Sequence, residues 1–296
     1  MRPGAMAAAL LAAAALPALA RAQRPRPAAT WDSVAAVLGT PAVPAAGYVR
    51  FDLPRRDLTV RMGDVTLAVP LAGEAWVGFA GEPRDATVIG DLLVTAAELE
   101  PVEAELLRGG FEITAIHDPL VGETPRLVGL RVAGRGPAVL LARGLDAALA
   151  RTGTPRPVTA AVEPPVTIDT AVVAAALGPG ARAHGSVAQY AVALADRRVR
   201  WRGRTLPPGL ALATTLDIQA LHPTRAVATG DLALLDRQVQ PVLRALAAHG
   251  IVAEALGGRL ADTSPAVSFV GVWADGTLRD VVRGLAAALD AARAAR

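Results

Sequence analysis

The sequence predicts an α+β fold built from two related halves, each with a ferredoxin-like-type β-α-β-β-α unit preceded by a β-hairpin region. The main observation is an internal repeat, because the stretch Gly90–Pro125 returns without a gap as Gly230–Pro265, at an offset of 140 residues. Within each stretch the apolar residues follow first a strand pattern and then a helix pattern. A repeat this long exceeds the roughly 20–50 residues of solenoid repeats, so it indicates a duplicated domain. We expect the halves to pack about a pseudo-twofold axis.

The first half is expected to begin with a short helix that Gly39 ends. A hairpin turn at 62–64 separates two alternating segments, and Thr95 with Glu98 has capping-box spacing at the start of a later helix. Gly109 and Gly110 end that helix. The predicted helices are Trp31–Leu38, the segment from Thr95 to Arg108, and Pro137–Arg151; the predicted strands are Phe51–Val60, Val65–Val69, Glu74–Ala80, Thr87–Val94, Phe111–His117 and Arg126–Val132.

The second half follows the same order after a proline-rich linker at 153–167. Asp169 is placed to cap a helix that ends at Leu177. We therefore expect a first repeat at 31–152 and a second, more diverged repeat at 168–296. The predicted strands are Val187–Leu194, Val199–Arg202, Ala211–Gln219, Ala226–Leu234, Ile251–Leu256 and Ala266–Trp273, and the later helices are Asp236–Ala248 and Leu278–Ala295.

Residues 1–22 have the pattern of a secretory signal peptide. Arg2 precedes the uncharged, mostly apolar run Ala5–Leu16, and Ala20-Arg21-Ala22 offers a small-x-small cleavage site. The alternative is an N-terminal anchor helix, although the run is short for a membrane span. Residues 23–30 form a Pro/Arg linker. We expect an exported protein, periplasmic or secreted, with no membrane span in the mature form and, since the chain has no cysteine, no lipid anchor.

Composition excludes several classes of chemistry. The chain has 0 cysteines and no lysine, so it offers no disulfide, thiol nucleophile, cysteine-bound metal or Schiff base. The 30 basic residues are all arginine and stand against 27 acidic residues. Because nucleic-acid binding depends on an excess of basic groups that neutralise phosphates, we expect no nucleic-acid partner.

A family resemblance runs through both halves. The motifs G-D-L, E-x-x-P-V, G-h-E-h-T-A-h-H (where h is hydrophobic) and E-T-P-R resemble the LppY/LpqO family of exported bacterial proteins and lipoproteins, which contain a domain of unknown function. The resemblance implies an exported, duplicated α+β protein and implies no activity. Family members typically read T-A-L-H-N-H, whereas His117 is followed here by Asp118, and a later family histidine is replaced by Arg131. In the second half Gly257 and Gly258 take the places of His117 and Asp118.

The candidate site residues lie at the end of one predicted strand and in the loop after it, where binding groups commonly lie. His117 and Glu123 are the catalytic candidates, as an acid–base pair. His117 and Asp118 are the metal candidates, since imidazole and carboxylate could hold a divalent cation that activates water; no other cofactor is indicated. His117, Asp118, Glu123 and Arg131 are the ligand-binding candidates. The alternative is that His117 bonds within its own loop and Asp118 only shapes a turn.

Asp91 and Asp231 occur at equivalent positions of the two halves, each directly after a glycine. A carboxylate at this place could be catalytic, but we expect it to bond the backbone at a strand bulge or at the entry to a helix, since a glycine in a strand often marks a bulge or a close approach.

Three functional hypotheses follow. The first is a binding or interaction protein whose partner, a small molecule or a component of the cell envelope, lies between the halves or at the His117 loop. The second is a metal-assisted hydrolase whose histidine-based site around His117 is degenerate, and the third is a purely structural role. The sequence identifies neither a reaction nor an oligomeric state.

Overall fold

The computed structural model describes residues 27–159, 165–178, 180–194, 198–210 and 212–295. The predicted signal peptide lies outside the described residues, as do 23–26 and 160–164 of the two predicted linkers. Among the helices of the described residues, none has the length and apolar character that a membrane span requires. We call residues 27–159 the first copy and residues 165–295 the second copy.

The first copy is built on a six-stranded antiparallel sheet of order β1-β2-β5-β6-β9-β7, with a small sheet of order β4-β3-β8 beside it. Its elements are α1 (Pro27–Leu38), β1 (Val43–Ala45), β2 (Tyr48–Asp52), β3 (Arg61–Met62), β4 (Val65–Thr66), α2 (Val69–Ala72), β5 (Trp76–Glu82), β6 (Asp85–Thr95), α3 (Leu99–Arg108), β7 (Glu112–His117), β8 (Glu123–Thr124), β9 (Leu127–Gly136) and α4 (Ala138–Leu149).

The second copy repeats this topology, with a six-stranded antiparallel sheet of order β10-β11-β14-β15-β18-β16 and a small sheet of order β13-β12-β17. Its elements are α5 (Thr170–Leu177), β10 (Arg182–His184), β11 (Val187–Ala193), β12 (Arg200–Trp201), β13 (Arg204–Thr205), β14 (Ala213–His222), β15 (Arg225–Leu234), α6 (Asp236–Ala248), β16 (Val252–Gly258), β17 (Thr263–Ser264), β18 (Ser268–Gly276) and α7 (Leu278–Ala294). The α+β class is confirmed, and the finer ferredoxin-like assignment stays a prediction.

Local predictions differ from the structure mainly in the first copy. Helix α1 begins at Pro27, four residues before the predicted start at Trp31, as suits a proline in a first helical turn. The strand predicted for Phe51–Val60 is wrong beyond Asp52, because Pro54 has no N–H to donate and Arg55 turns inward to bind Glu98. In the second copy Asp169 caps α5 as predicted, accepting from two backbone N–H groups of its first turn.

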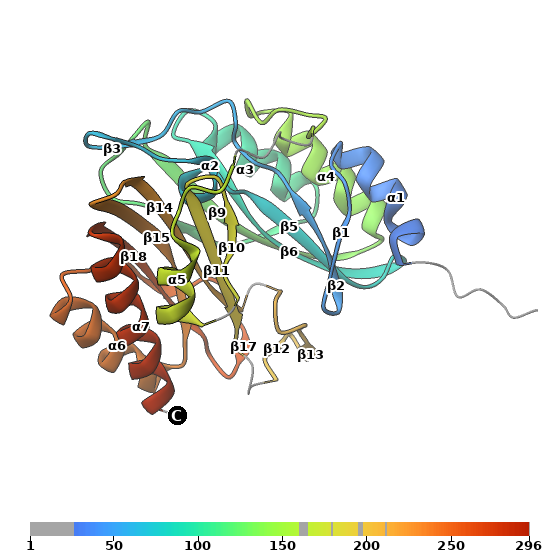
Figure 1. Ribbon diagram of the computed structural model, residues 1–296. Coiled ribbons are helices and arrows are strands. Elements are labelled where there is room, and N and C mark those ends of the chain that lie inside the picture. Colours follow the sequence, from blue (N-terminus) through green and yellow to red (C-terminus); the bar gives the residue numbers. More distant parts are fainter. Residues whose placement is uncertain (1–26, 160–164, 179, 195–197, 211, 296) are drawn as a thin grey trace, which may run out of the picture.

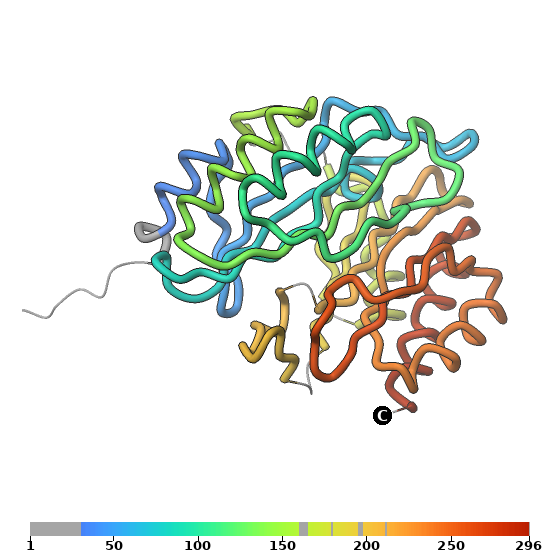
Figure 2. The backbone as a smooth tube through the Cα atoms, turned by 180° about the vertical axis from the view of Figure 1, so that it is seen from behind, coloured from blue at the N-terminus to red at the C-terminus, as the bar shows by residue number. Residues whose placement is uncertain are grey.

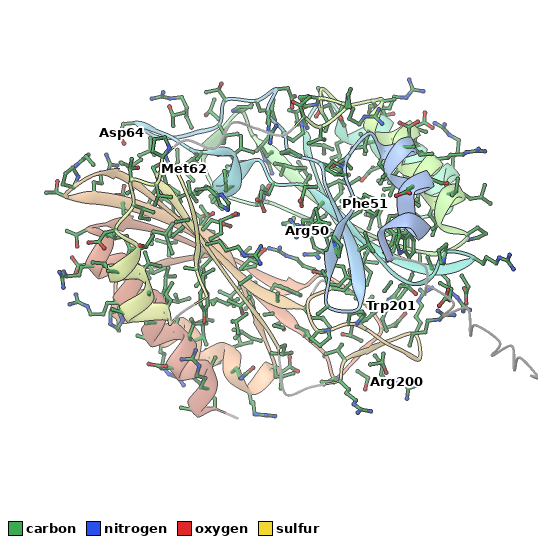
Figure 3. The ribbon with its side chains drawn as sticks, turned by 45° about the vertical axis from the view of Figure 1, so that its right-hand side comes forward. Arg50, Phe51, Met62, Asp64, Arg200 and Trp201 are labelled. Atoms are coloured by element: carbon green, nitrogen blue, oxygen red, sulfur yellow. The ribbon has the colours of Figure 1, made fainter. Side chains whose placement is uncertain are left out.

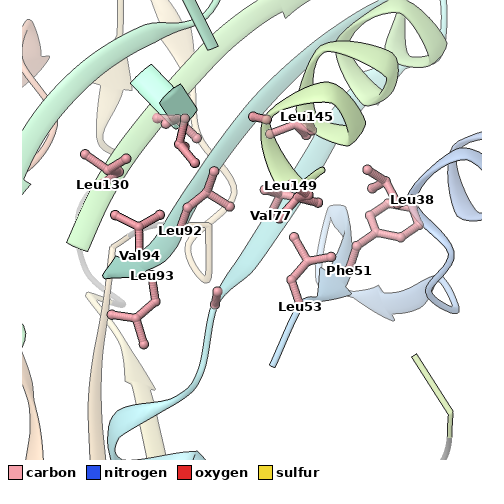
Figure 4. Packing of buried hydrophobic residues seen from close by; sticks show 14 of the residues in the cluster. Leu38, Phe51, Leu53, Val77, Leu92, Leu93, Val94, Leu130, Leu145 and Leu149 are labelled. Carbon is pink, nitrogen blue, oxygen red and sulfur yellow. The ribbon is translucent and has the colours of Figure 1, made fainter. Parts of the chain in front are cut away.

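The two sheets face each other, and the helices cover their outer faces (Figure 1). Helices α1, α3 and α4 pack on the first sheet, and α5, α6 and α7 on the second, as the view from behind also shows (Figure 2). In the first core Leu145 and Leu149 of α4 lie over Val77, Phe51 and Leu53 (Figure 4). A separate apolar cluster lies between the copies, where Ile89 and Ala133 of the first sheet join Trp201 and Phe269 of the second copy.

Each copy extends a hairpin onto the other. Met62 and Asp64 of the first copy's hairpin lie over the second sheet, and Arg200 and Trp201 lie beneath the first (Figure 3). Each hairpin is held by ion pairs, and the charges at equivalent positions, 140 residues apart, are reversed between the two sides. The pairs are Asp64–Arg225 and Arg225–Asp275 on one side, and Arg204–Asp85 and Arg135–Asp85 on the other.

This reversal of charge favours the pairing of unlike copies. If two first copies packed against each other, Asp64 of one would face Asp85 of the other, and these like charges would repel.

Reversing one of these charges tests the packing of the copies. We expect Asp64→Arg to lower the melting temperature at low ionic strength, because it places a positive charge against Arg225, 2.6 Å from the present carboxylate oxygen. The loss should shrink in high salt, since the Debye length falls from about 10 Å at 0.1 M to about 3 Å at 1 M. The control is Asp290→Arg, which removes an exposed pair within α7. Equal, salt-independent losses in both variants would contradict this role.

Candidate functional site

A cavity of about 150 Å³ lies between the two sheets and is lined by side chains of both copies. Arg50 lies in the space between the sheets (Figure 3). The charged and polar residues that line the cavity are Arg50, Glu74, Trp76, Asp91 and His117 of the first copy and Thr215, Asp217, Thr229, Asp231 and Arg259 of the second.

The repeated Gly-Asp pair forms part of this cavity for a steric reason. A Cβ atom on Gly90 would lie 2.5 Å from Val77 Cγ1 and 2.6 Å from the carbonyl oxygen of Trp76, so only glycine lets β5 and β6 approach this closely. At Gly230, where φ is +154°, a Cβ atom would lie 2.1 Å from the carbonyl oxygen of Thr215. Each glycine therefore allows the strand that carries the following aspartate to pack closely against the neighbouring strand.

Asp91 and Asp231 bind side chains of the cavity wall, so the predicted backbone role for these carboxylates is wrong. Asp91 Oδ2 lies 2.8 Å from Arg131 Nη2. Arg259 Nη2 donates to Asp231 Oδ1 at 2.5 Å, and its Nη1 bonds Asp231 Oδ2 and lies 3.8 Å from Asp91 Oδ2. Arg259 thus links the carboxylates of the two copies.

The protonation of Asp91 follows from these neighbours. Burial alone would raise the pKa of Asp91, but the charge of Arg131, the interaction with His117 and the charge of Arg259 outweigh burial and hold that pKa well below its usual range. Burial lowers the pKa of Arg131, which the charge of Asp91 partly offsets.

Arg131 is a buried cation held between aromatic rings of the two copies. Its guanidinium carbon lies 5.7 Å from the ring centroids of both Trp76 and Phe269. Its Nε and Nη1 atoms have no hydrogen-bond partner among the described residues. Since a cation over a ring face is attracted by the ring quadrupole, these two rings stabilise the charge beside Asp91.

His117 reaches the cavity because Gly129 faces it on β9. A Cβ atom on Gly129 would lie 2.3 Å from His117 Cε1, so any larger residue would displace the imidazole. His117 Nε2 lies 3.2 Å from Asp91 Oδ1. In the tautomer with the proton on Nε2, this nitrogen donates a hydrogen bond to the carboxylate and Nδ1 is left as an acceptor. Nδ1 is buried and has no hydrogen-bond partner among the described residues.

Glu74 and Asp217, one from each copy, form a second acidic feature of the cavity. The side-chain amide of Gln189 donates to both, at 3.0 Å to Glu74 Oε1 and 2.9 Å to Asp217 Oδ1. Burial and the charge of Glu74 raise the pKa of Asp217 well above its usual range, and partial loss of hydration raises the pKa of Glu74, whose side chain is 40% exposed. The pair therefore holds on to protons more strongly than carboxyl groups in water.

The structure brings together two of the four predicted ligand-binding residues, His117 and Arg131, which meet at Asp91. Asp118 is exposed and pairs with Arg126 at 2.9 Å. Glu123 is buried, and its Oε1 accepts the backbone N–H of Leu127 at 2.7 Å. Neither Asp118 nor Glu123 lines the cavity. In the part of the chain that the structure describes, no group of three or more histidine, cysteine, aspartate or glutamate side chains is arranged to hold a metal ion.

Most residues of the cavity are not indicated by the sequence. The repeated Gly-Asp pair is the exception, since the sequence singles it out, although the backbone role predicted for its aspartates is wrong. Glu74, Asp217 and Arg259 carry no comparable signal, because they meet only after the two copies pack together.

Comparisons with known proteins add family membership and no activity. A family model described as "Domain of Unknown Function (DUF1259)" matches residues 32–151 and again residues 171–291, which confirms the predicted duplication. A search of curated proteins gives no match.

Two solved structures show a faint likeness. One is EtuB from Clostridium kluyveri, with 13% identity, a TM-score of 0.22, and coverage of 85% of this chain and 89% of that one. The other is the double ringed trimeric shell protein MSM0271 from the RMM microcompartment, with 12% identity, a TM-score of 0.19, and coverage of 71% and 82%. At these TM-scores the likeness supports no conclusion.

Removing the charge of Asp91 tests the ion-pair network. We expect Asp91→Asn to destabilise the fold by roughly 3–5 kcal/mol at neutral pH, because it leaves the buried Arg131 without its carboxylate. The pKa of Asp91 is lower in the folded protein than in the unfolded chain. The charge of Asp91 therefore stabilises the fold at pH values above its unfolded pKa of about 3.9, and this stabilisation is lost as the pH falls toward the folded pKa. The difference between the proteins should therefore shrink in acid.

The measurement is denaturant unfolding at neutral and acidic pH. Asp118→Asn is the matched control, since it removes an exposed ion pair with little effect on stability. A neutral-pH loss no larger than that of the control would contradict the role of Asp91.

Proposed function

The chain belongs to the family described as Domain of Unknown Function (DUF1259), a description that names no activity, and we propose from its geometry that it binds a small polar molecule in the cavity between its two copies. The observation that carries the proposal is the convergence of charged side chains from both copies on one cavity.

This arrangement is costly for folding alone. Charged groups at an interface lose hydration, and apolar residues of similar volume would often serve stability as well or better. Both sheets also supply apolar contacts around Ile89 and Phe269, so part of the packing of the copies lies outside the cavity. A ligand that offers complementary charge and hydrogen bonds accounts for the polar walls.

The size and access of the cavity limit the ligand. Its volume of about 150 Å³ lies below the roughly 300–1,000 Å³ of pockets for drug-sized molecules. Thr215 is exposed and the side chain of Glu74 is 40% exposed, so the cavity reaches solvent on this side. The ligand is therefore a small molecule or one small group of a larger molecule that enters past Thr215.

The setting of this binding is also part of the proposal. The pattern of residues 1–22 supports export, so the ligand would be met outside the cytoplasm. The motifs around His117 support the narrower resemblance to the LppY/LpqO family.

Blocking the entrance tests the proposed site. A thermal-shift screen of small polar metabolites should find molecules that raise the melting temperature of the full chain, because a ligand that binds only the folded state stabilises it. Thr215→Phe should abolish this shift and leave the unliganded melting temperature nearly unchanged, since residue 215 is exposed.

Thr205→Phe is the matched control. Thr205 is also an exposed threonine on a strand of the second copy, but it does not line the cavity. Ligand shifts that persist in Thr215→Phe, or that vanish equally in Thr205→Phe, would rule out this cavity as the site.

A further inference from the structure

We infer that the two copies are held together at Glu74 and Asp217 by a contact that protonation strengthens, so that this side of the interface loosens as the pH rises from mildly acidic to neutral. The protein makes this contact by itself, so the inference goes beyond the proposed function and requires no ligand.

The contact attaches one wall of the cavity to the other copy. Residues 68–74 of the first copy, which we call the wall segment, include α2, and α2 lies on β14 and β15 of the second copy. At the start of the wall segment the backbone N–H of Ala68 donates to Gln219 Oε1 at 2.8 Å. At its end Gln189 Nε2 donates to Glu74 Oε1 at 3.0 Å. The wall segment lines the cavity, so loosening of either attachment changes the cavity wall.

Two pairs of carboxyl groups meet across the cavity, and each pair has one member from each copy. Asp91 and Asp231 share a cation, because Arg259 bonds Asp231 with both terminal nitrogens and its Nη1 lies 3.8 Å from Asp91 Oδ2. The pair at the wall segment shares the side-chain amide of Gln189, whose Nε2 lies 3.0 and 2.9 Å from the two carboxyl groups. An amide donates two hydrogen bonds but carries no charge, so it cannot offset two ionised carboxylates. The pair at the wall segment is therefore stabilised by taking up a proton.

The charged groups around this pair supply too little positive charge to replace the proton. They are Arg50, Asp52 and His184 around Glu74, and Arg50 and Asp231 around Asp217. Arg50 donates through Nε to Asp52 at 2.5 Å, and its Nη2 lies 3.6 Å from Glu74, so one arginine serves two acids. His184 adds positive charge only when it is protonated, which acid favours. The ionised acids therefore outnumber the cations at this contact when the pH is neutral.

The pKa shifts give the direction of the pH dependence. Burial, followed by the charge of Glu74, raises the pKa of Asp217 well above its usual range, and partial loss of hydration raises the pKa of Glu74. These pKa values are higher in the folded protein than in the unfolded chain. The stabilisation by the protonated pair is therefore fully present below the unfolded values of about 3.9 for Asp and 4.3 for Glu, and it is lost as the pH rises through the folded values. Asp91 has the opposite dependence, since its stabilisation is lost in acid.

Neutral analogues of the protonated carboxyl groups test the inference. Asp217→Asn and Glu74→Gln cannot ionise, so each should lower the equilibrium constant for denaturant unfolding of the full chain at about pH 8, by about tenfold or more for Asp217→Asn, and the gain should vanish toward about pH 4. The double variant should gain less than the sum of the single variants, because removal of either charge relieves the repulsion of the other. Asp290→Asn, on the exposed face of α7, is the control and should show no such dependence on pH.

Hydrogen exchange tests whether the change lies at the wall segment. The backbone N–H of Ala68 bonds Gln219 across the interface, so its protection from exchange reports whether the wall segment is attached. The reference is the N–H of Val270, on a central strand of the second core. The protection of Ala68 relative to Val270 should fall between about pH 4 and pH 8 in the parent protein and should stay high in Asp217→Asn.

Several results would overturn the inference. A gain in stability that is equal at the two pH values would show a change in packing, with no role for the proton. A loss of stability in Asp217→Asn at about pH 8, or fully additive gains in the double variant, would show that the two carboxylates do not repel each other at the contact. Protection of Ala68 that keeps pace with that of Val270 at all pH values would rule out loosening of the wall segment. These measurements use no ligand, so their outcome is independent of the metabolite screen with Thr215→Phe.

Discussion

The largely buried carboxylate of Asp91 is the group on which the arrangement of the two copies depends. It lies between two sheets whose outer faces are covered by helices, so its charge must be compensated at the interface itself. Arg131 supplies that compensation from the neighbouring strand, and Arg259 extends it to Asp231 of the second copy. Once these charges are paired, the apolar residues around Phe269 can close the rest of the interface, and a polar cavity remains beside them.

The duplication accounts for the shared topology of the two copies, and the sequence differences between the copies account for the asymmetry of the cavity between them. Asp91 and Asp231 are equivalent, as are the glycines before them, and both aspartates face the same cavity. The residues around them are not equivalent, since the positions 140 residues after His117 and Arg131 are glycines, and Asp231 takes its cation from Arg259 instead. The cavity is therefore asymmetric although the topology on its two sides is the same.

The sequence was informative where structure depends on local pattern. The gapless repeat predicted two copies of one α+β unit, and the limits of α6 and the cap of α5 came from helix periodicity and the position of Asp169. It was less informative where distant segments meet. Arg55 leaves the predicted strand to bind Glu98, and because Glu98 lies 43 residues further along the chain, no local pattern indicates this contact. Glu74 and Asp217 come together only when the two copies pack. His117 and Arg131 were identified as candidates, but their shared partner Asp91 was assigned to the backbone, because no local pattern shows which way a strand carboxylate points.

The most direct test of ligand binding between the copies is a crystal structure of the full chain with the molecule that stabilises it most in the metabolite screen. The account predicts density for that molecule between the two sheets, in contact with side chains of both copies that line the cavity. Density for the molecule elsewhere on the chain, with only ordered water between the sheets, would contradict it.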